Sequence, residues 1–183
     1  MATILTRSGT DANKPSNANA AELLLATDTH RLYHGNASGA PYEICPTSII
    51  MPKTLSTDHT SVGMKCIQTA GEALVFGDIC CGNNSGKWVK ADADAWSTAG
   101  GMLLMADASI SSDADGVFLI TGIARDDTSN WTLNAPLFLS TTPGVLTETA
   151  PSGTDDVIKI VAQATNNADT ILFRGIQGGI EHT

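Results

Sequence analysis

The chain has 183 residues, of which 42% are apolar and only 16% are charged, and its formal net charge is −9. This length suits one domain, or one domain with an arm. Its ten Lys and Arg residues are scattered, whereas direct nucleic-acid binding depends on clustered basic residues. No apolar run approaches the roughly 20 residues of a membrane span, so we expect neither direct nucleic-acid binding nor membrane insertion.

Residues 1–40 are rich in Asn, Ala and Thr and predict a short N-terminal attachment or oligomerisation arm. Within it, residues 21–26 fit either one helical turn or a short strand, and residues 31–33 predict a strand that stops at Gly35. An element of this size is not stable alone in water, so we expect it to pack against another chain or against the body. The apolar residues available for this packing are Leu23, Leu24, Leu25, Leu32 and Tyr33.

Residues 41–62 contain Pro41, Pro46 and Pro52. Because proline removes a hydrogen-bond donor from a central strand, this segment predicts a linker and an edge strand.

Residues 63–183 alternate short apolar runs with Gly, Pro, Asn and Asp turns, which predicts a C-terminal β-domain, or knob. The expected strands are 64–69, 74–81, 87–90, 102–105, 117–123, 137–139, 145–146, 157–161 and 171–173, and residues 93–99 fit a short helical or loop crossing. Roughly nine or ten strands at this spacing indicate an all-β fold, with a short N-terminal arm plus a C-terminal antiparallel β-barrel or β-sandwich.

The four cysteines, Cys45, Cys66, Cys80 and Cys81, include no Cys-x-x-Cys pair. Adjacent residues on a strand point to opposite faces, so Cys80 and Cys81 cannot share one metal or one disulfide partner easily. We predict that the cysteines are buried free thiols that pack as small apolar side chains.

Two patterns resemble metal-ligand spacing. His30 and His34 flank a short predicted strand, but a closed site needs further ligands; the alternative is that copies of one His meet on a trimer axis and hold an ion. The Asp-Ala-Asp pairs at 92–94 and 113–115 lack the additional ligands of a calcium loop and fit turns. We therefore expect no metal and no cofactor.

No Gly-x-Ser-x-Gly elbow and no phosphate-binding Gly-rich loop occurs, so the sequence predicts that the protein is not an enzyme. Trp88, Trp96 and Trp131 fit either core packing or sugar stacking, since an exposed indole packs well on a pyranose ring. Trp88 alternates with lysines in a predicted hairpin and is expected in the core. Trp96 is the expected surface-recognition residue.

Residues 20–35 read AAELLLATDTHRLYHG. This segment resembles the Glu-Leu…Thr-Asp-Thr-x-Arg-Leu-Tyr-x-Gly motif near the N-termini of many phage fibre proteins. It departs from the usual pattern at Ala21, where Gly commonly precedes Glu, and at His30, where a small residue is more common. The resemblance implies a small trimer-forming or attachment element that precedes a shaft or knob.

A second resemblance covers about residues 70–173. The motifs that carry it are GEA at 71–73 followed by GD at 77–78, GKWVKADAD at 86–94 and PLFLSTTPG at 136–144. These motifs, in this order, are similar to a β-domain of phage fibres and capsid decoration proteins. Because that family consists of structural parts, the resemblance implies no catalytic residue.

The resemblance implies a bacteriophage virion structural protein: a short trimeric fibre, anchored by its N-terminal arm, with a β-rich knob for host contact or particle assembly. The alternative is a capsid decoration (cement) protein that stabilises the phage head. A third hypothesis is a secreted carbohydrate-binding module, against which the absence of a signal-peptide pattern counts. The expected partners are further copies of the chain, other virion proteins of the tail, baseplate or capsid, and a host surface receptor. The expected location is the virion, after assembly in the host cytoplasm.

Overall fold

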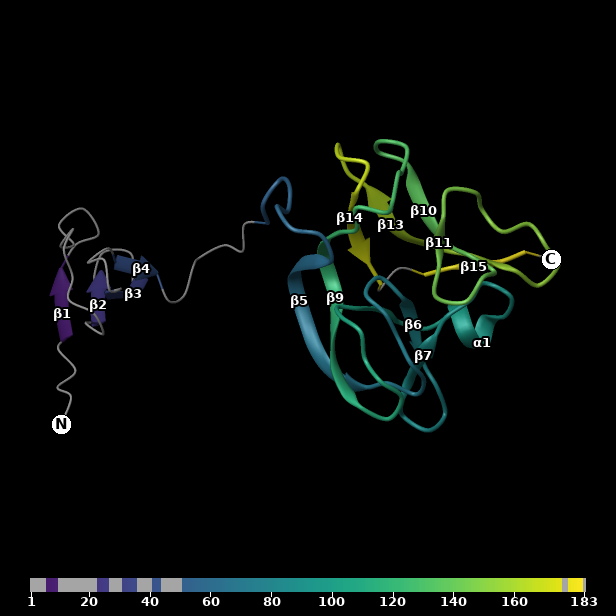
Figure 1. Ribbon diagram of the computed structural model, residues 1–183, viewed down its shortest axis with the longest axis horizontal. Coiled ribbons are helices and arrows are strands. Elements are labelled where there is room, and N and C mark those ends of the chain that lie inside the picture. Colours follow the sequence, from purple (N-terminus) through teal and green to yellow (C-terminus); the bar gives the residue numbers. More distant parts are fainter. Residues whose placement is uncertain are drawn as a thin grey trace. The chain divides into compact units, whose positions relative to one another are not determined.

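The computed structural model describes residues 51–175 and 178–182, together with four short strands between residues 6 and 43 (Figure 1). The chain divides into two compact units, the N-terminal unit Met1–Ile50 and the body Met51–Thr183. This division falls inside the stretch 41–62, which the sequence predicts to be a linker and an edge strand. Each unit is described by itself below.

The unit of residues 1–50 contains one sheet whose strands follow chain order, β1-β2-β3-β4. Its members are β1 (Thr6–Gly9), β2 (Leu23–Ala26), β3 (Arg31–Gly35) and β4 (Pro41–Glu43). β1 runs parallel to β2, and the other two pairs are antiparallel. Leu24 lies in register with Tyr33, and Leu25 with Leu32. Residues 23–26 are therefore a strand rather than a helical turn, and the five predicted oligomerisation residues lie on two neighbouring strands.

The described part of residues 51–183 is almost entirely β-structure, with one helical turn. Its elements are β5 (Thr60–Thr69), β6 (Ile79–Gly82), β7 (Trp88–Lys90), α1 (Trp96–Ala99), β8 (Leu103–Ala106), β9 (Asp115–Arg125), β10 (Pro136–Leu139), β11 (Leu146–Thr147), β12 (Val157–Ile158), β13 (Ile160–Ala164), β14 (Thr170–Arg174) and β15 (Ile180–Glu181). No helix in the described residues is long and apolar enough to cross a membrane.

The main sheet of this unit runs in the order β11-β10-β13-β14-β9-β8-β6-β7, with β5 along β9 and a separate pair β12-β15. Every strand pair in it is antiparallel, and the sheet curls into a half-barrel. The predicted all-β fold is confirmed. The predicted hairpin around residues 82–86 is also confirmed, since β6 and β7 pair across it.

The eleven-residue strand β9 joins the two halves of the sheet (Figure 1). Its second half pairs with β14, its first half pairs with β8, and β5 follows it along its whole length. The register with β5 shifts between Met64 and Lys65, and just beyond the shift Gly63 lies opposite Gly122. A Cβ on Gly63 would be 2.1 Å from the carbonyl oxygen of Thr121, and Gly122 has a φ of 155°. Only glycine fits this close approach of two backbones.

Strands β6 and β8 are buried on both faces, which explains why their apolar residues are consecutive instead of alternating. On β8, Leu103 and Met105 belong to one core cluster, and Leu104 belongs to a second. Cys81 lies in the first cluster and Cys80 in the second. The predicted opposite orientation of these two thiols is confirmed, and both are buried and free. Cys66 is only half-buried, and Cys45 lies outside the described residues.

Two predicted strands are wrong in their extent. In the stretch 74–81 only residues from Ile79 onward form a strand, because Gly77 has a φ of 89° and the Asp78 carboxylate accepts a hydrogen bond from the N–H of Val75, which together make a turn. The predicted strand 157–161 is divided into β12, which pairs with β15, and β13, which pairs with β10 and β14. Lys159 separates them and is almost fully buried, with its ammonium donating to the carbonyls of Ala99 and Gly101 at the end of α1.

Candidate functional site

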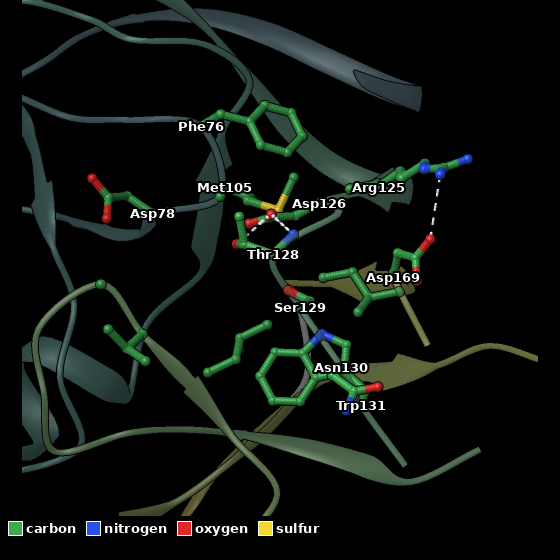
Figure 2. A pocket seen from close by; sticks show the side chains of 16 residues that line it. Phe76, Asp78, Met105, Arg125, Asp126, Thr128, Ser129, Asn130, Trp131 and Asp169 are labelled. Carbon is green, nitrogen blue, oxygen red and sulfur yellow. Dashed lines mark hydrogen bonds and ion pairs between the residues drawn. The ribbon is translucent and has the colours of Figure 1, made fainter. Parts of the chain in front are cut away.

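One candidate site is a groove of about 420 Å³ that is lined mainly by four segments of the body (Figure 2). Three of these segments are the loop 76–78, the stretch 124–131 at and beyond the end of β9, and the turn 144–146 between β10 and β11. The fourth is the start of β14, at residues 169 and 171. The groove is thus built by loops and strand ends that a rigid sheet holds together, which is the usual location of binding surfaces in β-folds.

The groove combines aromatic walls with polar groups. In the view of Figure 2, Asp126 and Thr128 lie between the rings of Phe76 and Trp131. The buried side chains of Met105 and Ile171 also line it. Aromatic rings beside hydroxyl and carboxylate groups suit a small polar organic ligand with an apolar face, such as a sugar ring.

The loop after β9 owes its shape to local hydrogen bonds. The Asp126 carboxylate accepts one bond from the Thr128 N–H at 2.9 Å and another from the Thr128 hydroxyl at 2.6 Å, which closes an Asx turn. The Trp131 N–H donates to the carbonyl of Ala168 at 3.1 Å, and the Asp126 N–H donates to the carbonyl of Asp169 at 2.9 Å. These bonds fasten the loop to the turn before β14 and fix the wall that Trp131 provides.

Arg125, at the end of β9, ties three segments together. Its guanidinium donates to the carbonyl of Leu55 at 2.6 Å and to the carboxylate of Asp127, and its Nη2 lies 3.4 Å from Oδ2 of Asp169. The hydrogen bond to Asp127 raises the pKa of Arg125 above its ordinary value. Residue 55, the loop after β9 and the start of β14 are thereby linked by one permanent cation.

A cluster of carboxylate and imidazole groups adjoins the groove. Nε2 of His59 lies 3.8 Å from Oδ2 of Asp58 and 3.7 Å from Oδ1 of Asp126. The His59 ring packs on Phe76, with the two ring centroids 5.0 Å apart. The cluster shares Asp126 and Phe76 with the groove. Among the described residues, Asp58, His59 and Asp126 form the one group of three or more such side chains close enough to hold a metal ion together.

Backbone donors fix the position of Asp58. Its Oδ1 accepts hydrogen bonds from the N–H of Asp127 at 2.8 Å and of His59 at 2.9 Å. The bond from Asp127, with a smaller contribution from the bond of His59, lowers the pKa of the Asp58 carboxyl below its ordinary value. Asp58 is therefore an anion at neutral pH, and its second oxygen points at His59.

The structure separates the three tryptophans. Trp88 is partly buried and packs on Phe118 with a centroid distance of 6.2 Å, which confirms the predicted core position. Trp96 is 50% exposed on α1, where its indole covers Gly100, and it does not line the groove. A recognition role for Trp96 stays a prediction. Trp131, for which the sequence leaves core packing and sugar stacking open, is the tryptophan in the groove.

The remaining candidates from the sequence are the two Asp-Ala-Asp pairs, the His pair and the apolar residues of the arm. Asp92 accepts a hydrogen bond from Thr98, and Asp113 pairs with Lys87 at 2.6 Å. His30 and the side chain of His34 lie outside the described part of the chain, as do the side chains of the five apolar arm residues. The ion on a trimer axis and the apolar arm contacts therefore stay predictions.

The sequence does not reveal the cluster around His59. Asp58 and His59 are adjacent, but the third member is Asp126, and only the pairing of β5 with β9 brings the two segments together. Comparison with known proteins finds no matching family model, no significantly similar curated protein and no significantly similar solved structure. Interpretation of the site therefore rests on its geometry.

Proposed function

We propose that the protein is a structural component of a bacteriophage virion, a short trimeric fibre that the N-terminal unit attaches to the particle. The observation that carries this proposal is the division of the chain into a β-rich body and a separate unit of four very short strands. The motif resemblance of residues 20–35, which overlaps β2 and β3, adds to it.

The small N-terminal sheet supports a role in oligomerisation. Its strands have only four, four, five and three residues, and a sheet becomes stable in water by burying an apolar face against another layer. Its central strands contain Leu23, Leu24, Leu25, Leu32 and Tyr33. Burying this apolar surface between three copies, at about 25 cal/mol per Å², contributes several kcal/mol per subunit.

The groove supports a role of the body in contact with a host surface. It is formed by loops between strands and combines Phe76 and Trp131 with hydroxyl and carboxylate groups. Exposed loops on a rigid β-scaffold tolerate sequence change without loss of the fold, which suits a surface that must match different receptors. The knob therefore provides the recognition surface, and the N-terminal unit provides the attachment.

The first experiment measures the mass of the full chain in solution, with crosslinking. We expect a trimer, and we expect Leu24→Glu to shift it to smaller species because a charge is placed in the apolar contact. Met102→Glu is the matched control, since Met102 is an exposed apolar residue of the body and its change should leave the trimer intact. A clean wild-type monomer contradicts the fibre.

The second experiment follows the protein on the particle. Deleting residues 1–50 should abolish incorporation into virions while the body keeps its β-sheet circular dichroism. Imaging of virions that carry the labelled chain then separates the two forms of the proposal: label at the tail supports the fibre, whereas label over the icosahedral shell supports a decoration protein instead.

A further inference from the structure

We propose that Asp58, His59 and Asp126 bind a divalent transition-metal ion of the zinc type. The first argument is geometric. The two measured separations from Nε2 of His59, 3.8 Å and 3.7 Å, are close to the roughly 3.4 Å between neighbouring ligands of a tetrahedral zinc ion with bonds of about 2.0–2.1 Å. All three ligand atoms lie within 4.8 Å of one another, so the two carboxylates and the imidazole have to move closer together to reach bonding distance.

The second argument is that the ligands are held in place by other groups, as in established metal sites. Oδ1 of Asp58 is occupied by two backbone N–H donors, which leaves Oδ2 directed at the cluster. Oδ1 of Asp126 is fixed by the N–H and the hydroxyl of Thr128, and an ion bound to this oxygen takes the place of the hydroxyl, which can rotate away. The His59 ring is held by its contact with Phe76. An ion therefore has little side-chain ordering to accomplish when it binds.

The third argument is electrostatic. Four carboxylates gather at this place, and the nearby guanidinium of Arg125 pairs with two of them, Asp127 and Asp169. Within the described residues, Asp58 and Asp126 have no ion-pair partner except His59. A divalent cation compensates the charge of these two anions.

The donor set indicates the type of ion. Ca²⁺ and Mg²⁺ prefer six or more oxygen ligands or retained waters, whereas an imidazole nitrogen with carboxylates suits Zn²⁺ and its neighbours. Three protein ligands leave the fourth position of a tetrahedral ion for water or for an oxygen of a bound molecule. Asp126 and Phe76 place this position beside the groove.

The ion would fasten the segment that enters the body to the rest of the fold. Asp58 and His59 directly precede β5, and Asp126 directly follows β9. A bridge between them closes the open end of the β5–β9 ladder, so metal binding stabilises the folded body.

The test is calorimetric titration of the full-length, metal-free protein with Zn²⁺ at pH 7.5, beside thermal unfolding with and without the ion. We expect one ion per chain at this site and a higher unfolding midpoint with Zn²⁺ than with equal Mg²⁺. His59→Asn and Asp58→Asn should each weaken binding at least about tenfold. Both variants suit the local structure, because Asn tolerates the φ of 50° at residue 59 and keeps the acceptor oxygen at residue 58.

The matched control is His182→Asn, which removes an exposed imidazole elsewhere in the described body and should leave the affinity unchanged. The cysteines are the alternative ligands, and zinc bound by thiolates survives both site variants. Unchanged affinity in His59→Asn, or no binding by wild-type protein at 100-fold excess of Zn²⁺, overturns the proposal. Circular dichroism of each variant confirms that a loss of binding is not a loss of the fold.

Discussion

Substituting Gly63 by Ala tests the close crossing of β5 and β9 most directly. The new Cβ would lie 2.1 Å from the carbonyl oxygen of Thr121 and 2.6 Å from the Cα of Gly122. Both atoms belong to the backbone, so no side-chain rotation relieves the clash, and the two strands must separate locally by about 1 Å to restore a van der Waals contact.

The loss of stability has two sources, overpacking at the crossing and weakened hydrogen bonds between the strands. Overpacking of a tight site costs about 1–3 kcal/mol, and one or two weakened ladder hydrogen bonds add about 0.5–1.5 kcal/mol each. We therefore expect Gly63→Ala to lower the free energy of unfolding by about 2–4 kcal/mol, and the urea midpoint by about 1–2 M.

Equilibrium unfolding in urea at 25 °C, followed by circular dichroism, measures this change. Gly101→Ala is the control, because a Cβ at Gly101 meets no atom within 4 Å, and it should change stability by less than about 1 kcal/mol. The same midpoint for the two variants would refute the close crossing of the strands.

Three further predictions concern the core. Iodoacetamide at pH 8 should label the half-buried Cys66 at least about tenfold faster than Cys80, whose burial raises the pKa of its thiol; peptide mass spectrometry measures the rates, and equal labelling contradicts the burial. Phe173→Ala, at a fully buried site, should lower the free energy of unfolding by about 3–5 kcal/mol in the same urea assay. Ile180→Ala, at an exposed site, should lower it by less than about 0.5 kcal/mol, and similar losses in the two variants would refute the core position of Phe173. Burial lowers the pKa of Lys159 below 10.5 in the folded state, so between the two pKa values the unfolded chain binds more protons and stability rises with pH. The unfolding free energy of wild type minus that of Lys159→Met should thus increase from pH 8 to pH 11. A constant or falling value would contradict the lowered pKa of Lys159.

The fold class was predictable because its signals are local. Turn residues at 82–86 and 111–116 separate apolar runs, and the paired strands β6–β7 and β8–β9 follow from that punctuation. The adjacent cysteines at 80 and 81 were also predictable, because alternation along a strand is a property of its backbone. The extent of individual strands was less predictable. Residues 74–78 are apolar enough for a strand, but the turn at Gly77 removes them from the ladder.

Long-range pairing decided the site. Nothing near Trp131 in the sequence distinguishes it from Trp96. Trp131 is placed in the groove because its backbone N–H donates to the carbonyl of Ala168, a residue distant in the sequence. Lys159 reads as a surface residue within a strand, yet its ammonium finds the carbonyls that end α1. Such partners are set by contacts between segments about 40–60 residues apart, for which one sequence carries no local signal.

The sequence by itself determined that this is an acidic, all-β chain, because composition, turn chemistry and alternation act over a few residues. The tertiary structure decided which loops meet in the groove and that Asp126 joins Asp58 and His59. The composition of the groove and of this cluster depends on the register of β5 on β9 and on two glycines that let the backbones approach closely. Register is a property of two distant segments at once, and it appears only when the chain is folded.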